Sequence, residues 1–204
     1  MTELCLIRHG ETDWNLKGLT QGATDIPLNA LGREQARITG SYIRQERWDA
    51  VYSSDLSRAR ETATIIAAAL REHPGAAASL EVALEPRLRE RGFGEAEGLD
   101  VVERKSRYRD SESIPGSESW ENVRLRGLAV LEELAERHRN ERVLVVSHGG
   151  LIISVLSELS SGKLRPGKPA LRNLSMSLVG RDEGWQVLWY NRLAPDLENE
   201  AVSA

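Results

Sequence analysis

The sequence is poor in cysteine, with Cys5 as its only example among 204 residues. A single cysteine excludes an internal disulfide and cannot form a zinc site by itself. Because Cys5 lies inside an apolar segment, it is expected to be a buried core residue. No apolar run reaches the roughly 18 residues that predict a membrane span. Met1 to Glu3 also lack the basic region and long apolar core of a signal peptide, so the expected location is cytoplasmic.

The sequence also lacks a large excess of either charge. Its formal net charge of -4 argues against general affinity for nucleic acid or for an anionic membrane. Any anion that the protein binds must therefore be attracted by local groups. No Pro/Gly/Ser-rich stretch is long enough to be a linker, and residues 1–204 are expected to form one domain. The sequence does not decide the assembly state, and a homodimer stays open.

Short apolar runs alternate with helical patterns along the chain. The runs at Leu4–Ile7, Ala50–Tyr52 and Arg142–Val146 are too short for typical helices and predict buried strands. Amphipathic periodicity predicts helices at about Gly32–Arg47, Leu56–Leu70 and Trp120–His138. This alternation predicts a three-layer α/β/α domain whose central sheet is mostly parallel.

Local signals give further expectations about the ends of these elements. Ser54 or Asp55 is expected to cap the helix that begins near Leu56. The β-prone runs Ser175–Val179 and Trp185–Trp189 are separated by a loop typical of a hairpin. The polar tail after Pro195 is expected to fray.

Polar residues follow three of the predicted strands. His9 comes after the first strand, Ser53 and Ser54 lead from another strand toward Arg58, and His148 follows a third. In parallel sheets, ligands gather at the carboxyl ends of the strands. These residues are therefore expected to lie along one rim, although they are far apart in the sequence.

Two histidines beside two arginines suit a phosphate group. Arg8 and Arg58 can each offer forked donors to phosphate oxygens. A cation in the first turn of a helix, as expected for Arg58, is disfavoured by roughly 0.3 to 1 kcal/mol unless an anion lies nearby. Asp55 is expected to supply part of that compensation, and a bound phosphate could supply more. A neutral His9 can attack phosphorus while His148 donates to the phosphoryl oxygens, and neither role requires a metal or other cofactor.

The leaving oxygen needs a proton, and a carboxyl group near the pocket is the natural source. Glu90 is the candidate, because it lies between Arg89 and Arg91 just before a glycine-bearing turn. An arginine-rich setting lowers the pKa of a carboxyl group. How Glu90 would hold its proton therefore stays an open question.

Five motifs occur in the order found in a known family. They are Arg8–Thr12 with Asn15, Leu28–Ala36, Ser53–Ala63, Leu88–Glu90 with Gly94 and Glu97–Gly98, and Val146–Gly150. Together they resemble the histidine phosphatase superfamily, which includes phosphoglycerate mutase, over residues 4 to 192. The resemblance implies a phosphoglycerate mutase-like fold and a small phosphorylated metabolite as substrate. It implies that His9 is phosphorylated and that Glu90 is the proton donor. It also implies that the phosphate pocket is completed by Arg8, Arg58 and His148. The further residues that it implies along the phosphate are Asn15, Gln21, Gly22 and Gly149.

The resemblance leaves hydrolase and mutase open, because both use the phosphohistidine step. The stretch Leu99–Ser119 is shorter than the insertion of the glycolytic mutases and favours the phosphatase branch. Within it, the basic cluster Arg104, Lys105, Arg107 and Arg109 either meets a second anion of the substrate or forms a solvated helix face. A catalytically silent phosphate-binding module is a third alternative, although such a protein is expected to have lost His9 or Glu90.

The remaining histidines and tryptophans have plainer interpretations. His73 and His138 match no motif and are expected to be structural residues at helix ends. Trp120, Trp185 and Trp189 are expected in the core, whereas Trp14, in the loop after His9, is a candidate wall of the pocket. No zinc site is expected, because only two histidines share the rim and no cysteine joins them.

Overall fold

A computed structural model describes residues 1–72, 80–164 and 170–202, so the prediction for His73 lies outside the described residues. A six-stranded sheet with the order β3-β2-β4-β1-β5-β6 forms its centre. The strands are β1 (Thr2–Arg8), β2 (Ala50–Ser53), β3 (Val82–Leu84), β4 (Arg142–Ser147), β5 (Met176–Arg181) and β6 (Trp185–Arg192). The pairs β1–β4, β4–β2 and β2–β3 are parallel, whereas β1–β5 and β5–β6 are antiparallel. The predicted α/β fold with a mostly parallel sheet is confirmed.

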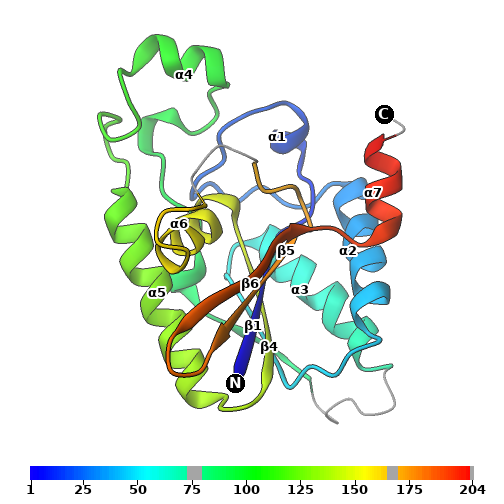
Figure 1. Ribbon diagram of the computed structural model, residues 1–204. Helices are drawn as coiled ribbons and strands as arrows, with labels where there is room; N and C mark the ends of the chain where they lie inside the picture. The colour runs from blue at the N-terminus through cyan, green and yellow to red at the C-terminus, as the bar shows by residue number, and fades with distance from the viewer. Residues whose placement is uncertain (73–79, 165–169, 203–204) are drawn as a thin grey trace.

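Helices cover both faces of this sheet (Figure 1). The helices α2 (Ala30–Ile43), α3 (Ser57–Leu70) and α7 (Pro195–Val202) lie on one face, and α5 (Trp120–Arg137) and α6 (Gly149–Leu159) lie on the other. The short helices α1 (Asp13–Leu16) and α4 (Val101–Arg107) stand beyond the end of the sheet, and two 3-10 turns occupy Pro86–Leu88 and Gly94–Ala96. No helix in the described ranges is long and apolar enough to cross a membrane.

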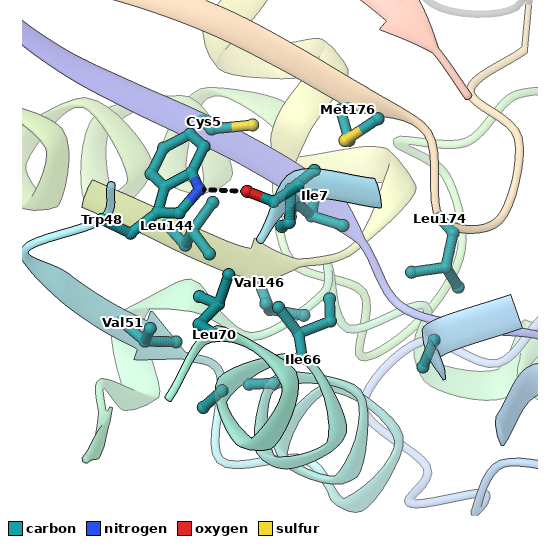
Figure 2. Close-up of a cluster of buried hydrophobic side chains, with 14 of the residues drawn as sticks. Cys5, Ile7, Trp48, Val51, Ile66, Leu70, Leu144, Val146, Leu174 and Met176 are labelled. Carbon is teal, nitrogen blue, oxygen red and sulfur yellow. Dashed lines mark hydrogen bonds between the residues drawn. The ribbon is translucent and has the colours of Figure 1, made fainter. Parts of the chain in front are cut away.

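Alternate residues of the central strands build two separate cores. Cys5 and Ile7 of β1 pack toward α2 and α3, whereas Leu4 and Leu6 pack toward α5 and α6, because successive side chains of a strand point to opposite faces. Figure 2 shows the first of these cores, in which Trp48 donates a hydrogen bond of 3.1 Å from Nε1 to the Ile43 carbonyl. Burial raises the pKa of the Cys5 thiol to about 12, as expected of a core residue rather than a reactive thiol.

Two expectations about element ends are wrong. The tail after Pro195 forms α7 instead of fraying, because Ala194 and Leu197 are buried in the core on the α2 face. Neither Ser54 nor Asp55 is the cap of α3, whose N-cap residue is Leu56. A carboxylate oxygen of Asp25 accepts a hydrogen bond of 2.7 Å from the Ser57 N–H, so a distant residue does the capping.

The structure also shows where the predicted hairpin, His138 and the tryptophans lie. The hairpin of β5 and β6 is confirmed, and Trp185 and Trp189 pack partly buried against the two cores. His138 caps the end of α5, where its Nε2 lies 3.0 Å from the Tyr52 hydroxyl, as expected of a structural histidine. The expectation that Trp120 lies in the core is wrong, because it is only partly buried and its ring stacks on the Arg91 guanidinium, 4.5 Å from the ring centroid.

Candidate active site

The carboxyl ends of β1, β2 and β4 bring the predicted residues together. The His9 N–H donates to the Ser147 carbonyl at 2.9 Å, and the Ser54 N–H donates to the Val146 carbonyl at 3.0 Å, so both loops leave the same edge of the sheet. The imidazole rings of His9 and His148 lie 5.1 Å apart between centroids, at an angle of 58°. The structure therefore places the two histidines side by side, as the rim prediction required.

His9 is a buried, neutral imidazole with a fixed tautomer. Its side chain is only 3% exposed, and its Nδ1 lies 2.7 Å from the Gly10 carbonyl oxygen. Burial, reinforced by the charges of Arg58 and Arg8, holds the pKa of His9 well below its usual value. Because the ring is neutral and Nδ1 donates its proton to Gly10, Nε2 keeps a free lone pair. This is the state that a histidine nucleophile requires.

The backbone around His9 is held by close packing. A Cβ at Gly10 would lie 2.5 Å from the Gly32 carbonyl oxygen, so the start of α2 packs directly on this loop. The Gly10 N–H donates to the Thr62 hydroxyl at 3.1 Å, and the Asn173 amide donates to the His9 carbonyl at 2.9 Å. Sequence reasoning missed Asn173, because it belongs to no motif and lies 164 residues from His9.

Two arginines flank His9 with part of their donors unused. One guanidinium nitrogen of Arg8 donates to the Leu171 carbonyl, and Arg58 donates to the carbonyls of Gly22 and Thr24 at 2.8 and 2.9 Å. In both side chains Nε is buried and has no hydrogen-bond partner within the described ranges. Burial lowers the pKa of both guanidinium groups, with Glu90 as the first opposing charge. Buried, unsatisfied donors of this kind are costly unless an anion meets them.

Asp55 does not compensate Arg58, which corrects the sequence expectation. Its carboxylate pairs with Arg89 at 2.6 and 2.5 Å. The negative charges that act on Arg58 are Glu90 first, and then Asp25 and Glu97. The compensation therefore comes from residues distant in sequence rather than from the same helix start.

His148 is fully buried at the N-cap position of α6, and its Nε2 lies 2.9 Å from the Ser54 hydroxyl. Burial first, and then the charge of Arg58, hold the pKa of His148 well below its usual value, so this ring is neutral as well. Its Nδ1 has no hydrogen-bond partner among the residues that the structure describes. The ring next to His9 thus also presents an unused nitrogen.

Glu90 lies at the N-terminus of α6. Its carboxylate accepts hydrogen bonds from the N–H groups of Gly150 at 2.9 Å, Leu151 at 3.1 Å and Arg91 at 2.9 Å. A helix N-terminus favours a negative charge at this place. A Cβ at Gly150 would come within 2.4 Å of the Glu90 carboxylate, so this position requires glycine for space. These contacts fix the carboxylate next to the arginines.

These residues open on a cavity of about 510 Å³. Among the predicted site residues, Arg8, His9, Asn15, Gln21, Gly22, Arg58 and Glu90 line it. Leu19, Phe93, Val101 and Arg104 form other parts of its wall. The structure thus assembles, around one cavity, residues from β1, α1, α3, α4 and the loops next to them.

Three predicted residues do not line this cavity. His148 is fully buried directly behind the cavity, against His9, and Gly149 lies beside Arg8, where a Cβ would be 3.5 Å from Arg8 Nε. The expectation that Trp14 walls the pocket is wrong, because its ring is packed against Gly98, with a Cβ there only 3.4 Å away. Trp14 therefore supports the loop instead of contacting the cavity.

Glu97 connects the two loops that frame the cavity. Its carboxylate accepts hydrogen bonds of 2.9 Å each from the N–H groups of Ala23, Thr24 and Phe93. Gly22 has a φ of +57°, and a Cβ there would lie 2.1 Å from the same carboxylate. Glu97 and Gly22 together fix the carbonyl that Arg58 binds.

Within residues 1–72, 80–164 and 170–202, no group of three or more His, Cys, Asp or Glu side chains is arranged to hold a metal ion. The chemistry that the described residues offer is that of a neutral imidazole, forked cations and a carboxylate. This combination suits transfer of a phosphoryl group to nitrogen.

Comparisons with known proteins agree with this assembly. The family model described as "Histidine phosphatase superfamily (branch 1)" matches residues 4–192. The chain is 39% identical over 192 residues to the "Uncharacterized phosphatase PhoE" of Bacillus subtilis, covering 94% of this chain and 95% of that protein.

Solved structures of phosphatases and mutases have the same fold as this chain. A phosphoserine phosphatase variant from Entamoeba histolytica, in complex with phosphoserine, superposes with a TM-score of 0.78 at 30% identity, covering 94% of this chain and 97% of that one. Phosphoglycerate mutase from Bacillus anthracis superposes with a TM-score of 0.79 at 26% identity, covering 92% of each chain. The phosphoglycerate mutase-like fold is confirmed, and phosphatases and mutases are both among the relatives.

Proposed function

This chain belongs to the histidine phosphatase superfamily, and we propose that it hydrolyses small phosphate monoesters through a phosphohistidine at His9. One observation carries the proposal. Three buried nitrogens without partners in the described structure, Nε of Arg8, Nε of Arg58 and Nδ1 of His148, lie around a neutral imidazole. A phosphoryl group would accept hydrogen bonds from both arginines, and from His148 when its proton is on Nδ1.

In the proposed first step, Nε2 of His9 attacks the phosphorus atom and forms the N–P bond as the bond to the ester oxygen breaks. Glu90 gives a proton to that oxygen, so that the alcohol leaves neutral. The positive charge that develops on the His9 ring is stabilised by the hydrogen bond from Nδ1 to Gly10. The charge on the phosphoryl oxygens is stabilised by Arg8, Arg58 and His148.

In the second step, water attacks the phosphorus atom and gives its proton to the Glu90 carboxylate, while the N–P bond breaks. The products are inorganic phosphate and the original state of both side chains. Glu90 can serve both steps because it lines the cavity together with His9, and three backbone N–H groups fix the position of its carboxylate. A rigid carboxylate can meet the leaving oxygen and the water at the same place.

The substrates that we propose are small phosphorylated metabolites. Support comes from the size of the cavity, about 510 Å³, and from the structural neighbour that is complexed with phosphoserine. A silent binding module is disfavoured, because both His9 and Glu90 are present and line the cavity. The mutase alternative has one observation in its favour, which is that Arg104 lines the same cavity and could hold a second anion.

Phosphate release tests the proposal directly. The purified protein is expected to release inorganic phosphate from p-nitrophenyl phosphate, phosphoserine and 3-phosphoglycerate, and an excess of EDTA is expected to leave the rate unchanged. Turnover of 3-phosphoglycerate to its 2-phospho isomer, dependent on a bisphosphate primer and without phosphate release, would instead support a mutase. Binding of phosphate with neither reaction would support the silent module.

A further inference from the structure

The four cations of the basic cluster, Arg104, Lys105, Arg107 and Arg109, lie in different places. Arg104 lines the cavity that contains His9. Lys105 and Arg109 line a neighbouring cavity of about 470 Å³, which shares Arg104 and Phe93 with the first. Arg107 lines neither cavity and lies 3.8 Å from Glu103. Only one of the four cations is therefore in a position to meet a substrate bound at His9.

Arg104 is fixed over the cavity by its helix and by the loop opposite. Asp100 and Glu103 form a capping box that starts α4. The Thr20 N–H donates to the Leu99 carbonyl at 2.9 Å, and the Arg104 guanidinium donates to the Thr20 hydroxyl at 3.3 Å. The half-buried side chain is thus held between α4 and the loop of Thr20.

Arg104 has no anionic partner of its own in the described structure. No described carboxylate lies within 4.0 Å of its guanidinium group. Among the described residues of the cavity wall, Glu90 is the only carboxylate, and three N–H groups already bind it. Next to Arg104 and Thr20, the wall near α4 contains the apolar side chains of Leu19, Phe93 and Val101. A guanidinium in such a place offers a forked, charge-assisted site to an anion.

We propose that Arg104 forms a second anion subsite, which selects monoesters whose leaving group carries a carboxylate or a second phosphate. This inference rests on the proposed phosphatase function. The apolar wall would contact the hydrocarbon of the leaving group, while Arg104 binds its anion. A carboxylate and a phosphate share this chemistry, so substrates of both kinds are needed to distinguish them.

Matched pairs of substrates test the subsite. Phosphoserine and phosphoethanolamine differ only in the carboxylate, 3-phosphoglycerate and glycerol 3-phosphate differ at the same place, and fructose 1,6-bisphosphate and fructose 6-phosphate test a second phosphate. Arg104→Ala is expected to raise KM at least about tenfold more for the doubly anionic member of a pair than for its partner. Arg107→Ala is the control, because it removes the same charge from the same helix outside the cavity.

The outcomes separate this inference from the proposed function. A selective loss confined to carboxylates or to bisphosphates supports the subsite and identifies its anion. An equal effect on both members of every pair, or no effect, overturns it even when the wild-type protein is a good phosphatase. If the wild-type protein releases phosphate from no substrate at all, the proposed function fails instead.

A second inference comes from an independent contact behind His9. The hydroxyl of Ser54, fully buried, lies 2.9 Å from Nε2 of His148 and accepts a hydrogen bond of 3.3 Å from the Leu56 N–H. Because Leu56 already donates to this oxygen, the hydroxyl proton is available for His148. In the described structure, Nε2 is the only acceptor within reach of that proton.

We infer that Ser54 is a positioning residue that donates to Nε2 and thereby places the proton of His148 on Nδ1. The opposite tautomer would leave the hydroxyl proton without an acceptor and would present a lone pair at Nδ1. A lone pair repels phosphoryl oxygens, whereas an Nδ1–H donates to them. Ser54 would in this way decide whether His148 can serve as a donor.

The nitrogen chemical shifts of His148 report the tautomer directly. The ¹⁵N spectrum of the wild-type protein is expected to show a protonated Nδ1 and an unprotonated Nε2. Ser54→Ala is expected to mix the two tautomers and to lower kcat about tenfold. Ser53→Ala is the control, since its buried hydroxyl donates to the Ser54 carbonyl at 2.8 Å and does not contact His148.

A wild-type spectrum with the proton on Nε2 would overturn the inference, whether or not the variant folds. Unchanged His148 shifts in Ser54→Ala would overturn it as well. A loss of kcat with unchanged shifts would show that the hydroxyl matters only for packing.

Discussion

Replacing His9 with alanine is expected to lower phosphate release by at least about 10⁴-fold, because the only nucleophile of the proposed mechanism is lost. No other nitrogen can replace it. The neighbouring ring of His148 is held by Ser54, and its centroid lies 5.1 Å from that of His9. The donors of Arg8, Arg58 and His148 remain in place. Inorganic phosphate should therefore still bind to the variant.

Chemical quenching with a ³²P-labelled donor measures this expectation. The wild-type protein should carry an acid-labile, base-stable label during turnover, and His9→Ala should carry none. His138→Ala is the matched control, since His138 is a partly buried histidine that contacts Tyr52 and Glu141 instead of the cavity. A label that persists in His9→Ala, or a label that resists acid in the wild type, would contradict the phosphohistidine step.

Replacing Arg58 with alanine is expected to lower kcat/KM by about 10³- to 10⁵-fold, the range found for arginines that stabilise a transferred phosphoryl group. Two functions are lost together. The unused Nε would no longer bind the phosphoryl oxygen, and the carbonyls of Gly22 and Thr24 would lose their donors. Arg58→Lys should recover little of this activity, because an ammonium group cannot offer the two parallel N–H donors of a guanidinium group.

Replacing Arg58 with alanine is also expected to lower the stability of the fold. Because Arg58 also holds the loop of Gly22 and Thr24, the free energy of unfolding is expected to fall by about 1 to 3 kcal/mol. Urea unfolding and steady-state kinetics measure both effects. Arg60→Ala, an exposed arginine of the same helix, should change neither. A near-normal rate in Arg58→Ala would refute its role at the phosphate.

Much of the fold follows from local patterns in the sequence. Short apolar runs and amphipathic segments predict the strands β1, β2 and β4 and the helices α2, α3 and α5, because burial against one face imposes a period on the residues themselves. The tail is the exception. Its sequence is polar on average, and only the position of α2 shows that Leu197 has a surface to pack against.

The positions of the candidate site residues follow from the sequence at the strand ends and follow less well elsewhere. His9 and His148 lie where the rule for parallel sheets places them, and Arg8, Arg58 and Glu90 surround the same cavity. Asn173 was missed, because a single asparagine in a loop carries no local signal. Asp55 was given the wrong partner, since both Arg58 and Arg89 were available to it and the sequence does not rank them.

The sequence by itself determined the family, the layered α/β architecture and the set of residues that can carry the chemistry, because these depend on residue types and on short-range periodicity. The tertiary structure alone decided the pairing of those residues. It assigned Ser54 to His148, Asp55 to Arg89, and Arg104 to the cavity of His9. The physical reason is that hydrogen bonds and ion pairs require a few ångströms of proximity, and distance between residues far apart along the chain is set by packing.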